Sequence, residues 1–126
     1  MSARTIQFII AGVFFLLGGW CVIAPESVLD LTVRPAYRSD DLIVPLLIAC
    51  FGAQALIAGL FAAFATFTRR TFFAYGVAVL PFFWFDYHFF VVEPVFNEFL
   101  LLDAVGNVIF VVMCVLGYRA LSTIRS

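Results

Sequence analysis

The chain alternates four long apolar segments with shorter polar ones. The apolar segments lie at about residues 5–24, 42–67, 72–92 and 99–118. Each has about the 20 residues that a helix needs to cross the hydrocarbon core of a bilayer. A helix also satisfies its own backbone polar groups there, where water is absent. We therefore predict an all-α integral membrane protein, with one domain over residues 1–126 folded as an antiparallel four-helix transmembrane bundle.

The start of the chain has some features of a signal peptide, because Arg4 precedes the first apolar segment. Pro25 follows Ala24 directly, however, and a proline just after the cut blocks cleavage. We expect an uncleaved membrane-anchoring helix. Residues 25–34 then alternate apolar and charged positions in a helical pattern, which predicts a short interfacial helix lying on the membrane.

Connections and small residues predict how the spans pack. Thr68–Thr71 is expected to be a tight polar connection, which makes the third span run antiparallel beside the second. Pro81 lies in the middle of the third span and is expected to kink it. Small residues let membrane helices approach closely. Those that we expect at the helix contacts are Gly12, Gly19, Ala49, Gly52, Ala55, Gly59, Ala63, Gly106 and Gly117.

Composition supports the membrane assignment and excludes several functions. Hydrophobic residues make up 65% of the chain and charged residues 12%, against about half and about a quarter in soluble domains. No basic cluster indicates nucleic-acid binding. Cys21, Cys50 and Cys114 lie in apolar segments without a Cys-x-x-Cys pair, which argues against zinc, disulfide or thiol redox chemistry.

The charges differ between the two predicted sides. On the side of both termini lie five arginines: Arg4, Arg69, Arg70, Arg119 and Arg125. On the other side lie two arginines and six acids: Arg34, Arg38, Glu26, Asp30, Asp40, Asp41, Glu93 and Glu98. Because arginine is enriched on the cytoplasmic side, we predict a multi-pass protein of the inner membrane with both termini in the cytoplasm.

Ionisable groups within a membrane mark candidate functional sites. Asp86 and Asp103 are expected at similar depths in the outer half, and Asn107 shares a helix face with Asp103. We expect these three residues to form a polar core with Gln54 below them, and with Trp20 at the depth of the aspartates. One interpretation is a structural hydrogen-bonded cluster in which Arg34 or Arg38 folds onto an aspartate. The other is an outward-facing cavity for a small amphipathic ligand.

His88 and Glu93 are weaker candidates. A histidine near a membrane surface is an ordinary interfacial residue. With Asp86 and Glu98 the pair could form an exposed metal site, but one histidine beside carboxylates is a weak indication of one. We therefore predict no metal and no cofactor, and no catalytic motif is present.

Three parts of the chain carry a resemblance to known proteins. They are GGWCVIAPESVL at 18–29, ACFGAQALIAGLFA at 49–62, and the arginine turn after it. Together these resemble the small bacterial four-helix membrane proteins of the DoxX-like and related uncharacterised families, which offer no catalytic residues to transfer. Acidic and aromatic residues in a membrane cavity are also similar, in residue type only, to sterol-isomerase-like four-helix proteins.

These observations leave three hypotheses about function. The first is a non-enzymatic accessory or assembly subunit that packs against other membrane helices, in a homo-oligomer or a larger complex. The second is a membrane-embedded binding protein or isomerase-like enzyme for a small lipophilic ligand, anchored by Asp86 and Asp103. The third is a proton or small-solute conduit along Asp86, Asp103, Asn107 and Gln54. The lipid bilayer is the expected surrounding in each case.

Overall fold

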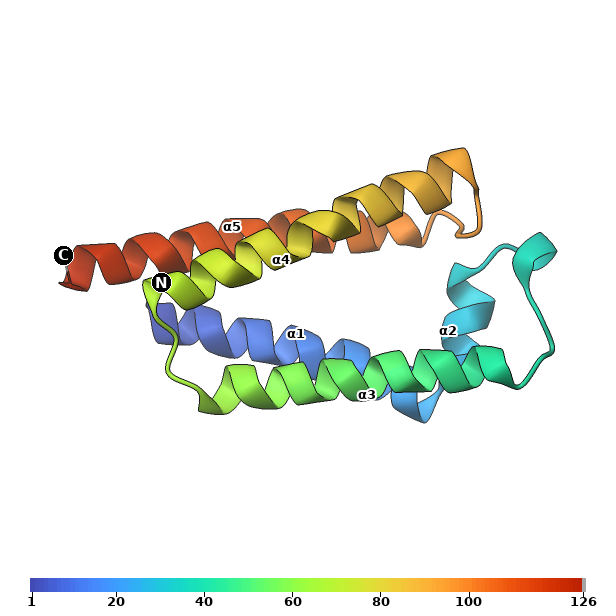
Figure 1. The fold of residues 1–126 in the computed structure, drawn as a ribbon, viewed down its shortest axis with the longest axis horizontal. Coiled ribbons are helices and arrows are strands. Elements are labelled where there is room, and N and C mark those ends of the chain that lie inside the picture. The colour runs from blue at the N-terminus through green and yellow to red at the C-terminus, as the bar shows by residue number, and fades with distance from the viewer. Residues whose placement is uncertain (126) are drawn as a thin grey trace.

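The computed structural model describes residues 1–125, with side chains as far as Leu121, and in that range it is helical (Figure 1). The side chain of Arg125, counted above among the charges, lies outside this range. The helical elements in chain order are α1 (Ala3–Ile23), α2 (Pro25–Thr32), the 3-10 turn η1 (Pro35–Tyr37), α3 (Ile43–Phe64), α4 (Arg69–Tyr87), the π-helical turn η2 (His88–Val92) and α5 (Leu100–Arg125).

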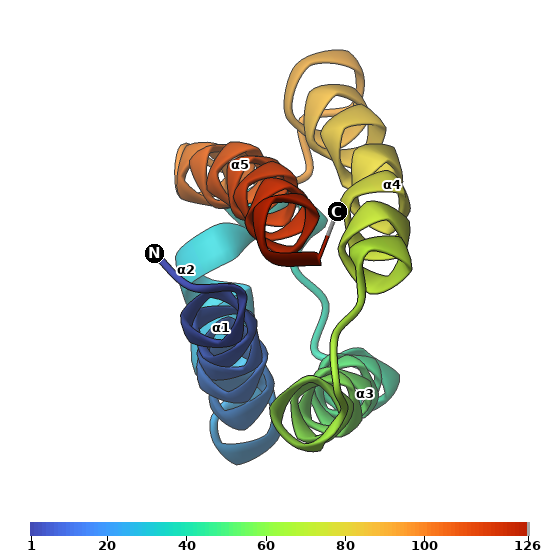
Figure 2. The ribbon, with the colours of Figure 1, turned by 90° about the vertical axis from the view of Figure 1, so that its left-hand side faces the viewer.

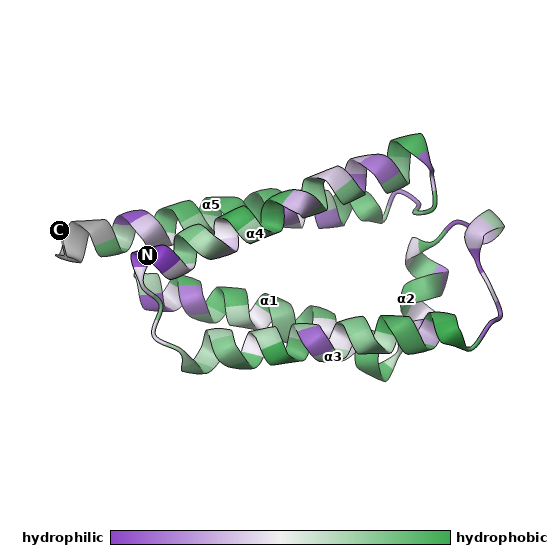
Figure 3. Ribbon diagram, in the orientation of Figure 1, coloured by the Kyte–Doolittle hydropathy of each residue, from purple (hydrophilic) through white to green (hydrophobic). Residues whose placement is uncertain are grey.

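Among the described residues, four helical segments are long and apolar enough to cross a membrane. They are Ala3–Ile23, Ile43–Phe64, Arg69–Val92 and Leu100–Leu121. Hydrophilic residues gather mainly at the two ends of these helices and in the connections (Figure 3). The all-helical fold class is thus confirmed, and the four apolar helices indicate a multi-pass membrane protein.

The connection between α3 and α4 differs from the prediction. Thr68–Thr71 is not a polar link, because Arg69 and Arg70 form the first turn of α4. Thr68 caps this helix: its hydroxyl accepts from the backbone N–H of Thr71 at 3.2 Å, and its own N–H donates to the Thr71 hydroxyl at 3.1 Å. The link is instead formed by residues 65–68, and Phe67 within it is 7% exposed.

The long helices pack as two pairs, α1 with α3 and α4 with α5, and α1 also contacts α5 (Figures 1 and 2). The expectation that the second span packs beside the third is therefore wrong, because α3 pairs with α1 instead of α4. The best-packed region lies toward the end that holds both termini. There Ile6 and Ile10 of α1 meet Phe72 of α4 and Cys114 of α5. Phe14 extends this cluster through ring contacts with Tyr75 and Phe110.

Glycine permits a close approach of the α1 and α3 backbones. A Cβ atom on Gly18 would lie 2.6 Å from the carbonyl oxygen of Gly52, and one on Gly52 would lie 2.6 Å from the Cβ of Cys21. Backbones this close leave no room for a side chain. The predicted contacts at Gly52, Ala55, Gly59 and Gly117 are present. Those at Gly12, Gly19 and Gly106 are wrong, since a Cβ there meets nothing within 4 Å.

Gln7 is a buried polar residue that the sequence analysis did not single out. It is 4% exposed, and its side-chain amide donates to the carbonyl oxygens of Ala62 at 2.8 Å and Ala65 at 2.6 Å. These carbonyls belong to the end of α3, where helical carbonyls lack partners within the helix. Gln7 therefore fixes α1 against the end of α3.

Replacing Gln7 with leucine is expected to lower the free energy of unfolding by about 1–2 kcal/mol, because two carbonyl oxygens lose their donor. Unfolding titrations in mixed detergent micelles measure this. Gln54→Leu is the matched control, because Gln54 is exposed on α3 and its loss should change little. Equal effects of the two substitutions would contradict this role of Gln7.

At the opposite end, the segment after α2 is bound to the connection between α4 and α5. The backbone N–H of Arg34 donates to the Val95 carbonyl at 2.8 Å, and that of Asn97 donates to the Thr32 carbonyl at 2.9 Å. The Asn97 side chain adds a 2.8 Å bond to the Leu31 carbonyl. These bonds tie the two helix pairs together at this end.

Candidate functional site

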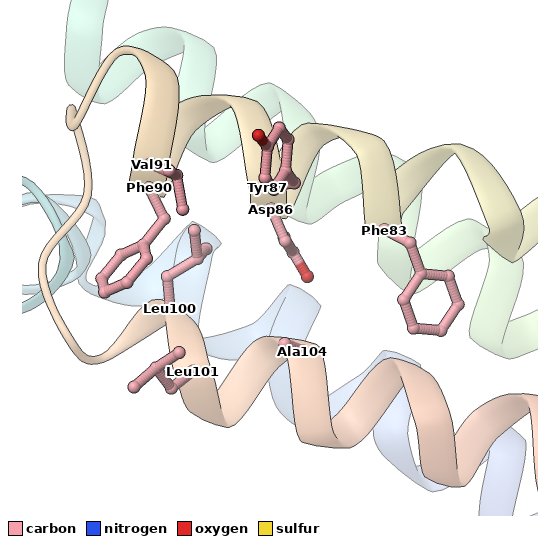
Figure 4. Close-up of a pocket in the computed structure, with 8 residues that line it drawn as sticks. All are labelled: Phe83, Asp86, Tyr87, Phe90, Val91, Leu100, Leu101 and Ala104. Atoms are coloured by element: carbon pink, nitrogen blue, oxygen red, sulfur yellow. The ribbon is translucent and has the colours of Figure 1, made fainter.

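The main polar cluster joins α4 and α5 through one asparagine. The Nδ2 atom of Asn107 donates to Oδ2 of Asp86 at 3.0 Å and to Oδ2 of Asp103 at 3.0 Å. An amide nitrogen carries two hydrogens, so one can serve each carboxylate. Asp103 and Asn107 are four residues apart on α5, and Asp86 points across from α4 (Figure 4). The predicted association of Asp86, Asp103 and Asn107 is therefore present.

The two carboxylates have no cationic partner among the described residues, and the expectation that Arg34 or Arg38 folds onto an aspartate is wrong. Arg34 donates from Nε to the Phe96 carbonyl at 2.8 Å. Arg38 donates to the carbonyls of Val33 at 2.9 Å and Asp30 at 2.7 Å. Both guanidinium groups thus donate to nearby backbone carbonyls and not to the aspartates. The cluster can therefore accept a cation or a further hydrogen-bond donor.

Asp103 is exposed although it lies on the packed face of α5. Asp103, Asn107, Phe110 and Cys114 follow one another at spacings of four, three and four, so they share a face. Cys114 is 3% exposed, and Phe110 contacts Phe14 on α1 and Tyr75 on α4. This face is thus covered by the other helices near the termini and uncovered at the aspartate.

A cavity of about 260 Å³ adjoins the cluster between α4 and α5 (Figure 4). Its walls are mostly apolar and include Phe83, Phe90 and Leu100, with Asp86 as the one charged side chain among the lining residues. An apolar hollow with a single convergent polar group is typical of sites for small lipophilic molecules.

Two further predicted site residues do not join the cluster. Trp20 donates from Nε1 to the Ser27 hydroxyl at 2.8 Å and packs on Phe99 with ring centroids 6.2 Å apart. It therefore holds α2 against α1. Gln54 is exposed on α3. It lies on the side away from α1, because Gly52 and Gly59 of α3 face α1. The continuous polar column predicted from Gln54 to the aspartates is thus not assembled.

His88 and Glu93 lie 3.5 Å apart, from Nε2 to Oε2, although a regular helix would point them in different directions. The π-helical turn η2 explains this, because the Glu93 N–H donates to the His88 carbonyl five residues earlier at 2.8 Å. His88 also stacks on Trp84 at 4.9 Å. In the described part of the chain, no three acidic, histidine or cysteine side chains converge on a possible metal position.

Comparison of the chain with known protein families, with curated proteins and with solved structures finds no match. The resemblance to DoxX-like proteins therefore stays a prediction.

Proposed function

We propose that this chain is a non-catalytic subunit of a membrane assembly. It would be an antiparallel four-helix transmembrane bundle of the inner membrane, with both termini in the cytoplasm, that packs against other membrane helices.

Charge supports the proposed orientation. Arg4, Arg69, Arg70 and Arg119 belong to helix ends on the side of the termini, and arginine is enriched on the cytoplasmic side of membrane proteins. The opposite end carries α2 and the acidic connections.

The uncovered carboxylate of Asp103 is the observation that carries the proposed role. A charge within a membrane is costly unless it is paired or hydrated. Here Asn107 donates to Asp103, no basic side chain among the described residues pairs with it, and the surrounding α5 residues Leu101 and Leu102 are 51% and 64% exposed. A basic or hydrogen-bonding group on a neighbouring helix would complete the cluster and cover this apolar surface.

The test is to purify tagged wild-type protein and the Asp103→Asn variant in mild detergent and to quantify co-purifying membrane proteins. Asp103→Asn removes the charge and keeps the shape. We expect it to lower recovery of a genuine partner about tenfold, because a charge-assisted bond contributes about 1.5–3 kcal/mol. Asp30→Asn, at the exposed end of α2, is the control and should leave recovery unchanged. Equal recovery with all three proteins would contradict the proposed role.

A second candidate function is binding of a small lipophilic ligand, including isomerase-like chemistry on it. The apolar cavity beside Asp86 favours this candidate. The same purification distinguishes the two, because a monomer that retains a bound lipophile and no partner would support ligand binding instead. The conduit hypothesis has less support, because Gln54 lies apart from the aspartates.

A further inference from the structure

A basic cavity lies between α4 and α5 at the end that holds the termini, away from the aspartate cluster. Its volume is about 460 Å³, and its lining residues are Arg69, Arg70, Phe73 and Tyr118. Phe73 is 66% exposed and Tyr118 is 37% exposed, so aromatic surface as well as positive charge faces the opening. Basic pockets between membrane helices bind the head groups of anionic lipids.

Arg69 is held in place but has no anionic partner among the described residues. Its Cζ atom lies 4.1 Å from the ring centroid of Tyr118, a cation–π contact that orients the guanidinium. Its Nε–H is buried and has no hydrogen-bond acceptor among the described residues. A buried donor without an acceptor is destabilising. A phosphate oxygen in the cavity would supply that acceptor.

Arg70 adds a second charge beside the first. It is exposed, and no carboxylate in residues 1–125 forms an ion pair with either arginine. The mutual caps of Thr68 and Thr71 fix the first turn of α4 and hence the backbone positions of both arginines. Two guanidinium groups without acidic partners provide several donors for one phosphate group.

The level of the cavity along the helices favours a lipid over a soluble anion. The candidate membrane span of α4 begins at Arg69, and Tyr118 on α5 lies at the same level, in contact with the Arg69 guanidinium. Arginine and tyrosine at the ends of membrane helices lie at the depth of the lipid head groups. This step rests on the proposed membrane placement. The exposed rings of Phe73 and Tyr118 offer apolar surface to the glycerol and upper acyl chains, which inorganic phosphate lacks.

We propose that this cavity is a binding site for the phosphate head group of an anionic phospholipid, held by Arg69 and Arg70 and bordered by Phe73 and Tyr118. The proposed cytoplasmic orientation would place it in the leaflet whose surface is negative.

The test is to reconstitute the full chain in nanodiscs that contain phosphatidylcholine and phosphatidylglycerol, and to count retained lipids by native mass spectrometry. The wild type should retain phosphatidylglycerol preferentially. Arg70→Gln and Arg69→Gln should each lower that preference about fivefold, the effect expected for one interfacial arginine. Arg4→Gln is the matched control, because Arg4 lies at the same end and also rests on an aromatic ring, that of Phe8 at 5.1 Å, outside the cavity.

The proposal is overturned if the wild type shows no preference, or if Arg4→Gln lowers it as much as the cavity substitutions do. Displacement of phosphatidylglycerol by inorganic phosphate would show a soluble anion site instead. Arg70→Gln decides the outcome even if Arg69→Gln fails to fold, because the Arg70 side chain is exposed and forms no hydrogen bond or ion pair with the described residues. Nanodiscs present both lipids on both faces and need no partner protein. The result is therefore independent of orientation and of the assembly role.

Discussion

Replacing Gly18 with leucine is expected to lower the free energy of unfolding by about 3 kcal/mol or to abolish folding, the upper range for overpacking. A side chain at Gly18 would meet the carbonyl oxygen of Gly52 at 2.6 Å and the backbone nitrogen of Leu56 at 2.9 Å. Backbone atoms cannot move aside as a flexible side chain can, so α1 and α3 must separate. Unfolding titrations in mixed micelles, together with the yield of folded protein, measure the effect.

Gly12→Leu is the control for this substitution. It lies on the same helix, six residues earlier, and a Cβ there meets nothing within 4 Å. Both substitutions gain the same helix propensity, about 0.8–1 kcal/mol for removing a glycine, so the difference between them isolates the packing. Similar stability of the two variants would show that α1 and α3 do not meet at Gly18.

Asn107→Leu is expected to lower the free energy of unfolding by about 2 kcal/mol, because two carboxylates lose the donor that they share. The interaction is charge-assisted, so the loss should depend on the aspartates. Asp103→Asn removes one of these charges. In that background, the effect of Asn107→Leu should fall clearly below its effect in the wild type, as a double-mutant cycle measures. An unchanged effect would mean that Asn107 stabilises the fold without the carboxylates.

Helix length and local spacing explain what the sequence could predict. The apolar segments alone indicate four membrane-length helices, and the four-residue spacing of Asp103 and Asn107 places them on one face. Asp86 could be matched to them because the residues lie at similar depths in neighbouring spans. The predicted pairing of Arg34 or Arg38 with an aspartate was wrong, because both arginines donate to backbone carbonyls in nearby connections. No pattern in the sequence signals such contacts.

The sequence could not predict which side of each helix faces its neighbour, because this depends on the rotation of the helix about its own axis. Gly12, Gly18 and Gly19 are equally small, but only Gly18 faces Gly52, and the packing of whole helices sets that rotation. The same holds for Gln7, whose partners lie 55 and 58 residues away. The π-helical turn at His88 aligns residues five apart, so the His88–Glu93 contact does not follow from regular helical spacing.

The two ends of the molecule are thus chemically distinct. Near the termini, Gln7 and the aromatic cluster pack the helices tightly, and a basic cavity lies between α4 and α5. At the other end, the cluster of Asp86, Asp103 and Asn107 is partly uncovered and has no cationic partner in the described residues. In the proposed orientation, the first end would stabilise the bundle and bind lipid at the cytoplasmic surface, and the second would contact other membrane helices.

Labelling of single cysteines tests this orientation most directly. In a variant with Cys21, Cys50 and Cys114 replaced by alanine, Ser39→Cys and Thr66→Cys place one exposed thiol at each end. A membrane-impermeant maleimide is added to intact spheroplasts and again after lysis. If both termini are cytoplasmic, as proposed, Ser39→Cys is labelled before lysis and Thr66→Cys only after it. Labelling of Thr66→Cys in intact spheroplasts, or of Ser39→Cys only after lysis, would contradict this orientation.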